Sequence, residues 1–270
     1  MLVVFRAGAA TPGNGSVPSS SEPGLLAPGI DAPATAHFER VWHLGRVTGD
    51  LERIIAFYQD VIGLDLRGAR DQRLPFLTNA ALDEFVAAPE GAQFRAVHLP
   101  IPGASSITDP AESISLEAFE YRGIDRRQVL PALSRPGVSN LLFLVPDLER
   151  AIASAKSADV AFITAEHSCV EVETPAGFNG HARAVMLRDP DGYPIELMQL
   201  DPAPASLAPP GARILDAMIV VVVADLDASI RFYQRFLGEG TLTSAPTRWR
   251  QSDGAERLRA LPPSGIAACC

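Results

Sequence analysis

The stretch that decides the fold is VTGDLERIIAFYQDVIG, residues 47–63, because the chain repeats it. Residues 222–238 read VVADLDASIRFYQRFLG, at a constant offset of 175 residues. A third and weaker copy, VPDLERAIASAKSADV, occupies residues 145–160, where Asp147 follows Asp50 by 97 residues. A repeat of this kind indicates one supersecondary unit that the chain uses three times.

Each copy has the same local pattern, which predicts a strand followed by a helix. Asp50 follows a β-rich run and suits a helix N-cap, and apolar residues then recur at helical spacing. Gly63 suits the left-handed end of that helix. Further strands are predicted in segments 94–103, 114–121, 160–164, 169–174 and 182–200. Each complete unit is therefore predicted as βαβββ, and the fold class as α+β. Two paired units would form a half-closed, barrel-like sheet with a concave face open to a ligand.

Composition shifts along the chain predict four parts. Residues 1–37 are rich in Gly, Pro and Ser and are expected to be a flexible tail, and residues 38–200 hold the two complete units. Residues 201–213 form a Pro/Ala-rich linker. Residues 214–270 are predicted to be a partial, truncated copy of a second domain.

Charge and cysteine content limit the function classes. The chain has 32 acidic and 23 basic residues and a formal net charge of -9, which disfavours nucleic acid as a partner. No apolar run approaches the roughly 18 residues of a membrane span, so no membrane partner is expected. Three cysteines give no disulfide framework and fit a reducing compartment, so we expect a cytoplasmic protein.

Three segments, residues 43–66, 137–152 and 186–200, carry a resemblance to a known family. They resemble the glyoxalase, bleomycin-resistance and extradiol-dioxygenase group, the vicinal oxygen chelate superfamily, over residues 40–200. The resemblance implies that the paired modules hold a divalent metal on their concave face. It also implies that the ligands come from the first and last strands of each module.

The resemblance places the first ligand of each module seven residues before the capping aspartate. This position is His43 in the first module and Asn140 in the second, where the family usually has a histidine. The closing strands supply Glu117 and Glu196. The resemblance therefore implies His43, Glu117 and Glu196 as metal ligands, Asn140 at the fourth ligand position, and the two glutamates as catalytic groups.

Each of these residues also has a simpler structural explanation. A carboxylate within an apolar strand is costly unless it binds a metal or is paired, so Glu196 could instead be satisfied by a neighbouring donor. Glu120 lies in the same strand as Glu117, and a bulge would decide which of them faces the ligand. His98 lines the pocket by strand alternation or is an ordinary core residue.

The donor set determines which metals and reactions are compatible. An amide at Asn140 removes the two-histidine, one-carboxylate set of non-haem Fe(II) oxygenases, so an extradiol dioxygenase is the less favoured function. One imidazole and two carboxylates suit Mn or Mg and tolerate Zn, Co or Ni. This favours a lyase or isomerase acting on a small molecule with adjacent oxygens. The alternative is a metal-free protein that binds and sequesters a small molecule.

The third copy carries Met218 at the first-ligand position, and a thioether suits packing better than chelation of a hard metal. We therefore expect the ligand site to lie within the first 200 residues. The unpaired half-module would leave sheet edges exposed. Either it is truncated or another chain completes it, and a homodimer is one assembly of that kind.

Overall fold

The structure is a computed structural model, and it describes residues 3–7, 43–66, 75–79, 84, 86–102, 114–125, 127, 132–164, 168–173, 179–203 and 208–237. The elements in chain order are β1 (Val3–Ala7), β2 (His43–Thr48), α1 (Leu51–Ala56), the π-helix η1 (Phe57–Ile62), β3 (Gln93–Pro100), β4 (Ser115–Arg122), β5 (Ser139–Leu144), α4 (Leu148–Ser157), β6 (Ser168–Glu173), β7 (Asn179–Arg188), β8 (Pro194–Asp201), β9 (Asp216–Val223) and α5 (Leu226–Leu237).

The first module is built on the three-stranded sheet β2-β4-β3. Strand β2 pairs with β4 in parallel, β3 pairs with β4 antiparallel, and α1 and η1 form the connection after β2. Leu77 forms an isolated bridge with Phe94 of β3, at the place of the module's second strand. Within the described residues this module is a βαβββ unit whose second strand is reduced to one bridge.

The second module has the same strand order, β5-β8-β7-β6, within the larger sheet. Strand β5 pairs with β8 in parallel, while β7 pairs antiparallel with β8 and with β6. The strand expected at residues 160–164 is reduced to one bridge between Phe162 and Leu187. Two open sheets built from βαβββ modules confirm the predicted α+β fold.

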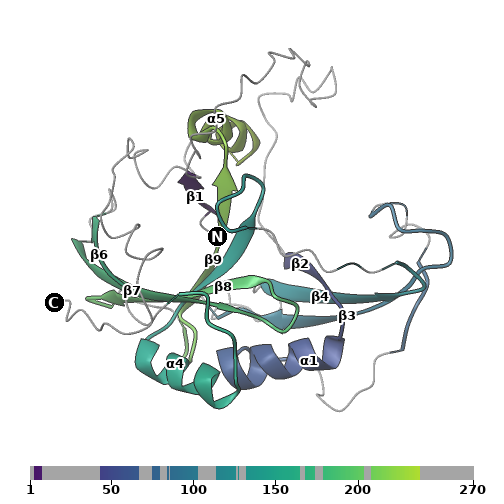
Figure 1. The fold of residues 1–270 in the computed structure, drawn as a ribbon, viewed down its shortest axis with the longest axis horizontal. Helices are drawn as coiled ribbons and strands as arrows, with labels where there is room; N and C mark the ends of the chain where they lie inside the picture. Colours follow the sequence, from purple (N-terminus) through teal and green to yellow (C-terminus); the bar gives the residue numbers. More distant parts are fainter. Residues whose placement is uncertain are drawn as a thin grey trace.

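The third copy of the repeat extends the second module. Strand β9 pairs antiparallel with β5, on the edge of β5 that lies away from β8. Strand β1 pairs in parallel with β9 (Figure 1). Strand β1 therefore lies within residues 1–37, which the sequence assigns to a flexible tail. The strand and helix expected in the third copy are β9 and α5. The division of the chain into four parts stays a prediction.

Helices α1 and α4 lie side by side beneath the strands (Figure 1). Alternate residues of the strands pack with them into one core, which includes Leu44, Leu116, Leu141 and Ile195. Because side chains alternate across a strand, the residues between these face the opposite side of each sheet. His43, Glu117, Asn140 and Glu196 lie on that opposite side.

The predicted helix starts are confirmed. The side chains of Asp50, Asp147 and Asp225 accept hydrogen bonds from the backbone N–H three residues later, at 3.0, 2.9 and 2.8 Å. This contact satisfies a donor that has no partner inside the helix.

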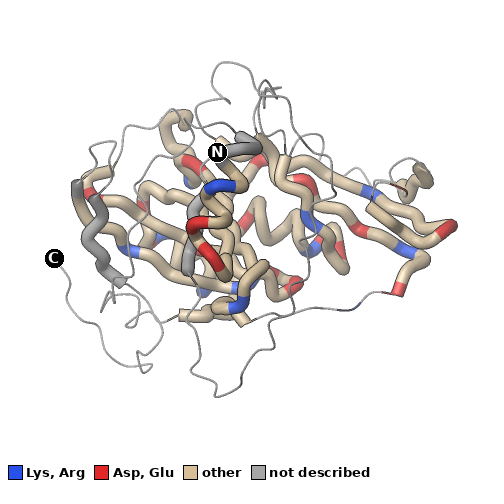
Figure 2. Tube along the Cα trace, turned by 90° about the horizontal axis from the view of Figure 1, so that it is seen from above, with Lys and Arg blue, Asp and Glu red and all other residues tan. Residues whose placement is uncertain are grey.

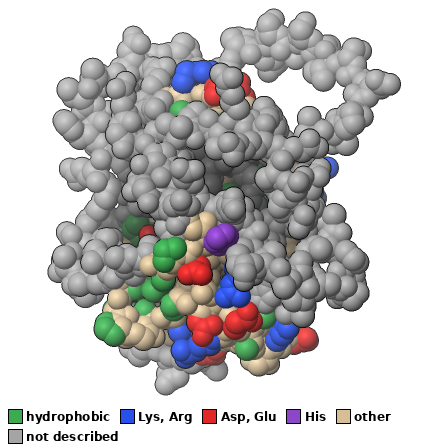
Figure 3. Space-filling model, turned by 90° about the vertical axis from the view of Figure 1, so that its left-hand side faces the viewer, with side chains coloured by type: hydrophobic (Ala, Val, Ile, Leu, Met, Phe, Trp, Pro, Cys, Tyr) green, Lys and Arg blue, Asp and Glu red, His purple; other side chains and the backbone are tan. Residues whose placement is uncertain are grey.

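No helix in the described ranges is long and apolar enough to cross a membrane. Acidic and basic positions are interspersed along the described trace (Figure 2), and acidic and basic side chains lie next to one another in the coloured lower part of Figure 3.

Arg213, at the end of the predicted linker, is fixed to both modules. Its guanidinium donates to the backbone oxygens of Asp60 and Val61 at 2.9 and 2.5 Å, and to Ser154 Oγ of α4 at 2.9 Å. The two carbonyls belong to the last turn of η1, which lacks intrahelical donors for them. Arg213 therefore joins the end of η1 to α4.

Gly63 ends η1 with a φ of 99°, as the sequence predicts. A Cβ added there would lie 2.7–2.9 Å from side-chain atoms of Arg213. Gly63→Ala is expected to lower the free energy of unfolding by about 2 kcal/mol, since the left-handed backbone costs a side chain about 1–2 kcal/mol and Arg213 is displaced as well. Urea unfolding measures the effect.

Gly91→Ala is the matched control for this prediction. Gly91 has a φ of 81°, and a Cβ there would have no neighbour within 4 Å, so this variant carries backbone strain alone. Equal destabilisation by the two variants would show that the contact between residue 63 and Arg213 contributes nothing.

Candidate metal centre

The two module-closing glutamates occupy equivalent positions in the structure. In the parallel pair β2 and β4, Glu117 lies opposite Gly45, and in the parallel pair β5 and β8, Glu196 lies opposite Leu142. Gly45 and Leu142 are 97 residues apart, which is also the separation between Asp50 and Asp147, the capping aspartates of the first and second modules. The strand register therefore makes Glu117 and Glu196 counterparts, as the sequence predicts.

Each glutamate contacts the first-ligand position of its own module. His43 Nε2 lies 3.0 Å from Glu117 Oε2, and Asn140 Nδ2 donates to Glu196 Oε2 at 3.2 Å. We call His43 and Glu117 the first half-site, and Asn140 and Glu196 the second half-site. The fold thus repeats the same contact between a first strand and a last strand in both modules.

The half-sites differ in exposure and in chemistry. The side chain of His43 is 44% exposed and that of Glu117 is 12% exposed, so the first half-site is accessible. Asn140 and Glu196 are both buried. The amide N–H of Asn140 gives the Glu196 carboxylate a hydrogen-bond donor, which is the simpler explanation considered for this residue.

The three predicted ligands are not gathered into one cluster. Within the described part of the chain, no group of three His, Cys, Asp or Glu residues could hold a metal ion as it stands. The first half-site lies in the three-stranded sheet and the second in the six-stranded sheet. An imidazole nitrogen and a carboxylate oxygen 3.0 Å apart are donors that suit a divalent ion, so the chemistry of the first half-site fits one. The joint role of His43, Glu117 and Glu196 stays a prediction.

Glu120 lies on the helix side of the sheet and not with Glu117. Its carboxylate accepts hydrogen bonds from the backbone N–H of Leu51 at 3.2 Å and from Arg95 Nη2 at 2.5 Å. The register of β4 against β2 and β3 runs without a bulge, so Glu117 and Glu120 face opposite sides. Glu120 stabilises the start of α1, where a negative charge is favoured.

His98 lies directly opposite Glu117 in the antiparallel pair of β3 and β4. Its Nε2 atom is 3.3 Å from Glu117 Oε1, and its side chain is 35% exposed. It therefore faces the same side of the sheet as the first half-site. The sequence predicts this position as pocket-lining, but it gives no sign that His98 contacts Glu117.

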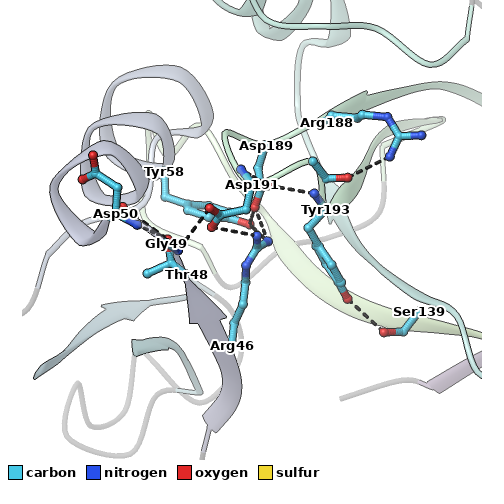
Figure 4. A network of polar contacts seen from close by, with 11 residues as sticks. Arg46, Thr48, Gly49, Asp50, Tyr58, Ser139, Arg188, Asp189, Asp191 and Tyr193 are labelled. Atoms are coloured by element: carbon cyan, nitrogen blue, oxygen red, sulfur yellow. Dashed lines mark hydrogen bonds and ion pairs between the residues drawn. The ribbon is translucent and has the colours of Figure 1, made fainter. Parts of the chain in front are cut away.

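A polar network joins β2 to the turn between β7 and β8 (Figure 4). Arg46 of β2 forms an ion pair with Asp189 and lies over the ring of Tyr193 at 4.5 Å from its centroid. Asp189 Oδ2 also accepts from Tyr58 at 3.2 Å, and Asp191 Oδ1 accepts from the backbone N–H of Gly49 at 3.2 Å. The sequence indicates only a turn at DPDG, residues 189–192, because a contact across 143 residues has no local signature.

The network is buried, and this changes the proton affinities of its members. Burial raises the pKa of the Asp189 carboxyl, against the opposing effect of Arg46. Burial likewise raises the pKa of Tyr58 well above its usual value. Burial alone would lower the pKa of Arg46, but the acidic groups of Tyr58, Asp189 and Asp191 outweigh it, so the pKa is raised. Arg46 lies three residues after His43 on β2, and Tyr193 lies three residues before Glu196 in the hairpin of β7 and β8. The network therefore fixes the strand that carries His43 relative to the hairpin that carries Glu196.

The strand topology and the paired half-sites define a protein of repeated βαβββ modules with polar ligand-type residues on their first and last strands. A family model described as the Glyoxalase/Bleomycin resistance protein/Dioxygenase superfamily matches residues 40–197. The match covers more than half of the chain, and the chain belongs to this superfamily.

Curated relatives carry the name lactoylglutathione lyase. One from Oryza sativa subsp. japonica is 26% identical over 200 residues, which are 74% of this chain and 54% of that protein. A second from Arabidopsis thaliana, described as probable and chloroplastic, is 24% identical over 199 residues, which are 74% of this chain and 44% of that protein. The chain thus spans about half the length of the curated relatives it matches.

Solved structures that resemble the chain include a glyoxalase family protein from Bacillus cereus, with 14% identity and a TM-score of 0.47 over 62% of this chain and 97% of that one. A glyoxalase I variant from Zea mays has 18% identity and a TM-score of 0.44 over 72% of this chain and 54% of that one. Both scores lie below 0.5, so the assignment rests on the strand topology and the family model.

Proposed function

We propose that the protein is a divalent-metal-dependent lyase or isomerase of the glyoxalase type, acting on a small molecule with adjacent oxygens. The observation that carries the proposal is the contact between His43 and Glu117 on adjacent strands, on the side of the sheet that faces away from the helices. The relatives' printed name makes lactoylglutathione the first compound to assay.

In this proposal His43 and Glu117 bind the ion and Glu196 is the further carboxylate ligand. A divalent ion bound there would polarise the substrate oxygens and stabilise the negative charge that develops on them. A carboxylate of Glu117 or Glu196 then moves the proton between neighbouring substrate atoms. The burial of Glu196 beside Asn140 would keep water from its carboxylate.

The metal content of the protein tests this function. We expect the wild type, purified without chelator, to retain a divalent ion by mass spectrometry of the metal. His43→Ala should lose it, and Glu196→Ala should bind it more weakly. The control is His181→Ala in β7, a histidine opposite Asp201 and outside both half-sites, which should leave the metal content unchanged.

The hydrogen bond between Asn140 and Glu196 favours a second candidate function, metal-free binding of a small molecule. This bond satisfies the buried carboxylate of Glu196 without an ion. If the wild type neither retains nor takes up a divalent ion, and yet is stabilised by small molecules in a thermal-shift screen, that result would favour metal-free binding over the enzyme proposal.

Asn140→His is expected to raise the affinity for Zn, Co or Ni by about tenfold, because it places an imidazole next to Glu196 as His43 is placed next to Glu117. Calorimetric titration of the wild type and the variant measures the change. Equal or weaker binding by the variant would mean that the second half-site takes no part in holding the ion.

A further inference from the structure

His98 contacts two side chains of β4, and both contacts depend on its imidazole nitrogens. Nε2 lies 3.3 Å from Glu117 Oε1, and Nδ1 lies 2.9 Å from Ser115 Oγ. Ser115 is only 2% exposed, so water has little access to its hydroxyl group. A hydroxyl held at Nδ1 fixes the ring orientation and leaves Nε2 directed at the carboxylate.

The second module shows that the fold does not require these residues. The strand register that places His98 opposite Glu117 places Met186 opposite Glu196. Pro194 holds the place of Ser115, two residues before the glutamate in each closing strand. Methionine and proline complete the same module without an imidazole or a hydroxyl. The first module therefore carries His98 and Ser115 although a module of this fold can form without them. Packing alone does not explain why these two residues occur there.

The two imidazoles flank one carboxylate. His43 Nε2 contacts Glu117 Oε2 and His98 Nε2 contacts Glu117 Oε1, at 3.0 and 3.3 Å. Their ring centroids are 6.1 Å apart. With metal–nitrogen bonds of about 2.1 Å, two imidazoles on one ion have centroids about 5–6 Å apart, so a small rotation brings both nitrogens onto one ion. Both side chains are partly exposed, and a Cβ built on the neighbouring Gly45 meets nothing within 4 Å, which leaves room for that rotation.

We propose that His98 is a third metal ligand, and that His43, His98 and Glu117 close around one divalent ion within the first module, with Ser115 positioning His98. The inference rests on the proposed function and adds to it a ligand outside the repeated positions and a class of metal. Two imidazoles and one carboxylate favour borderline ions such as Fe(II), Zn, Co or Ni over Mg or Mn, which prefer oxygen. His98 would thus supply, from the first module, the second imidazole that Asn140 removes from the second module.

The experiment titrates the full-length, metal-free chain with Zn(II), Co(II) and Mg(II), using calorimetry and the visible absorption of bound Co(II). The variant is His98→Met, because methionine occupies the equivalent position in the second module and is compatible with the fold. We expect His98→Met to weaken Zn(II) and Co(II) binding at least about tenfold and to change the Co(II) spectrum, while Ser115→Ala weakens binding less. His181→Ala in β7, outside both half-sites, is the matched control, and it should leave the Co(II) spectrum unchanged.

The outcomes separate this inference from the proposed function. A His98→Met variant that binds Zn(II) and Co(II) as the wild type does, with the same spectrum, overturns the role of His98 and leaves the function standing. Preference of the wild type for Mg(II) overturns the metal class. Failure of the wild type to bind any of the three ions overturns both. Circular dichroism of each variant shows that a loss of binding is not a loss of fold.

Discussion

Arg46→Ala is expected to lower the free energy of unfolding by about 3–5 kcal/mol at pH 7, because it leaves a buried carboxylate without its cationic partner. The side chain of Arg46 is 9% exposed and that of Asp189 is 0% exposed. The variant also loses the contact with the ring of Tyr193. Urea unfolding followed by circular dichroism measures the change.

Arg127→Ala is the control for this prediction. Arg127 pairs with Asp125 at 3.0 Å, but their side chains are 84% and 76% exposed, so the loss should not exceed about 1 kcal/mol. Similar losses in Arg46→Ala and Arg127→Ala would contradict the view that burial gives the Arg46 network its importance.

The effect of Arg46→Ala should also depend on pH. Burial raises the pKa of Asp189 even with Arg46 present, and removal of the guanidinium raises it further. Between the unfolded and the folded pKa the folded variant then binds more protons than the unfolded chain, so its stability falls as pH rises through that window. The difference from the wild type should be smaller at pH 5 than at pH 7.5. A loss that is the same at both values would mean that Asp189 does not take up a proton in the variant.

Ile214→Ala is expected to lower the free energy of unfolding by about 2–5 kcal/mol, because it removes a fully buried side chain and leaves a cavity. Ile214 directly follows Arg213 and belongs to the same core as Leu51 and Ile195. The sequence places it at the start of the partial C-terminal unit. A loss of this size would show that the first residues after the linker stabilise the two-module core.

Val47→Ala is the control for Ile214→Ala. Val47 is 59% exposed, so its truncation should change the free energy of unfolding by no more than about 0.5 kcal/mol. An Ile214→Ala variant as stable as Val47→Ala would support the predicted separation of residues 214–270 from the core. Truncation after Asp201 would then be expected to preserve stability as well as ligand binding.

Local patterns predicted the repeated elements of this fold. An aspartate cap needs only the N–H three residues later, so Asp50, Asp147 and Asp225 are recognisable from sequence. The offset between the copies also predicted that His43 and Asn140 are counterparts, and the strand register makes their partners, Glu117 and Glu196, counterparts as well. The short bridges at Leu77 and Phe162 were less predictable than β6, because short strand segments depend on their neighbours for pairing.

Only the tertiary structure decided which side of the sheet each acid faces and which distant groups meet it. The resemblance favours Glu117 over Glu120, but the sequence leaves open whether the two face the same side, and the pairing of β4 with β2 and β3 assigns them to opposite faces. The contacts of His98 with Glu117 and of Arg46 with Asp189 join different strands and leave no trace in local spacing. The physical reason is that periodicity records how a residue relates to its neighbours along the chain, whereas strand register and burial arise when distant segments pack together.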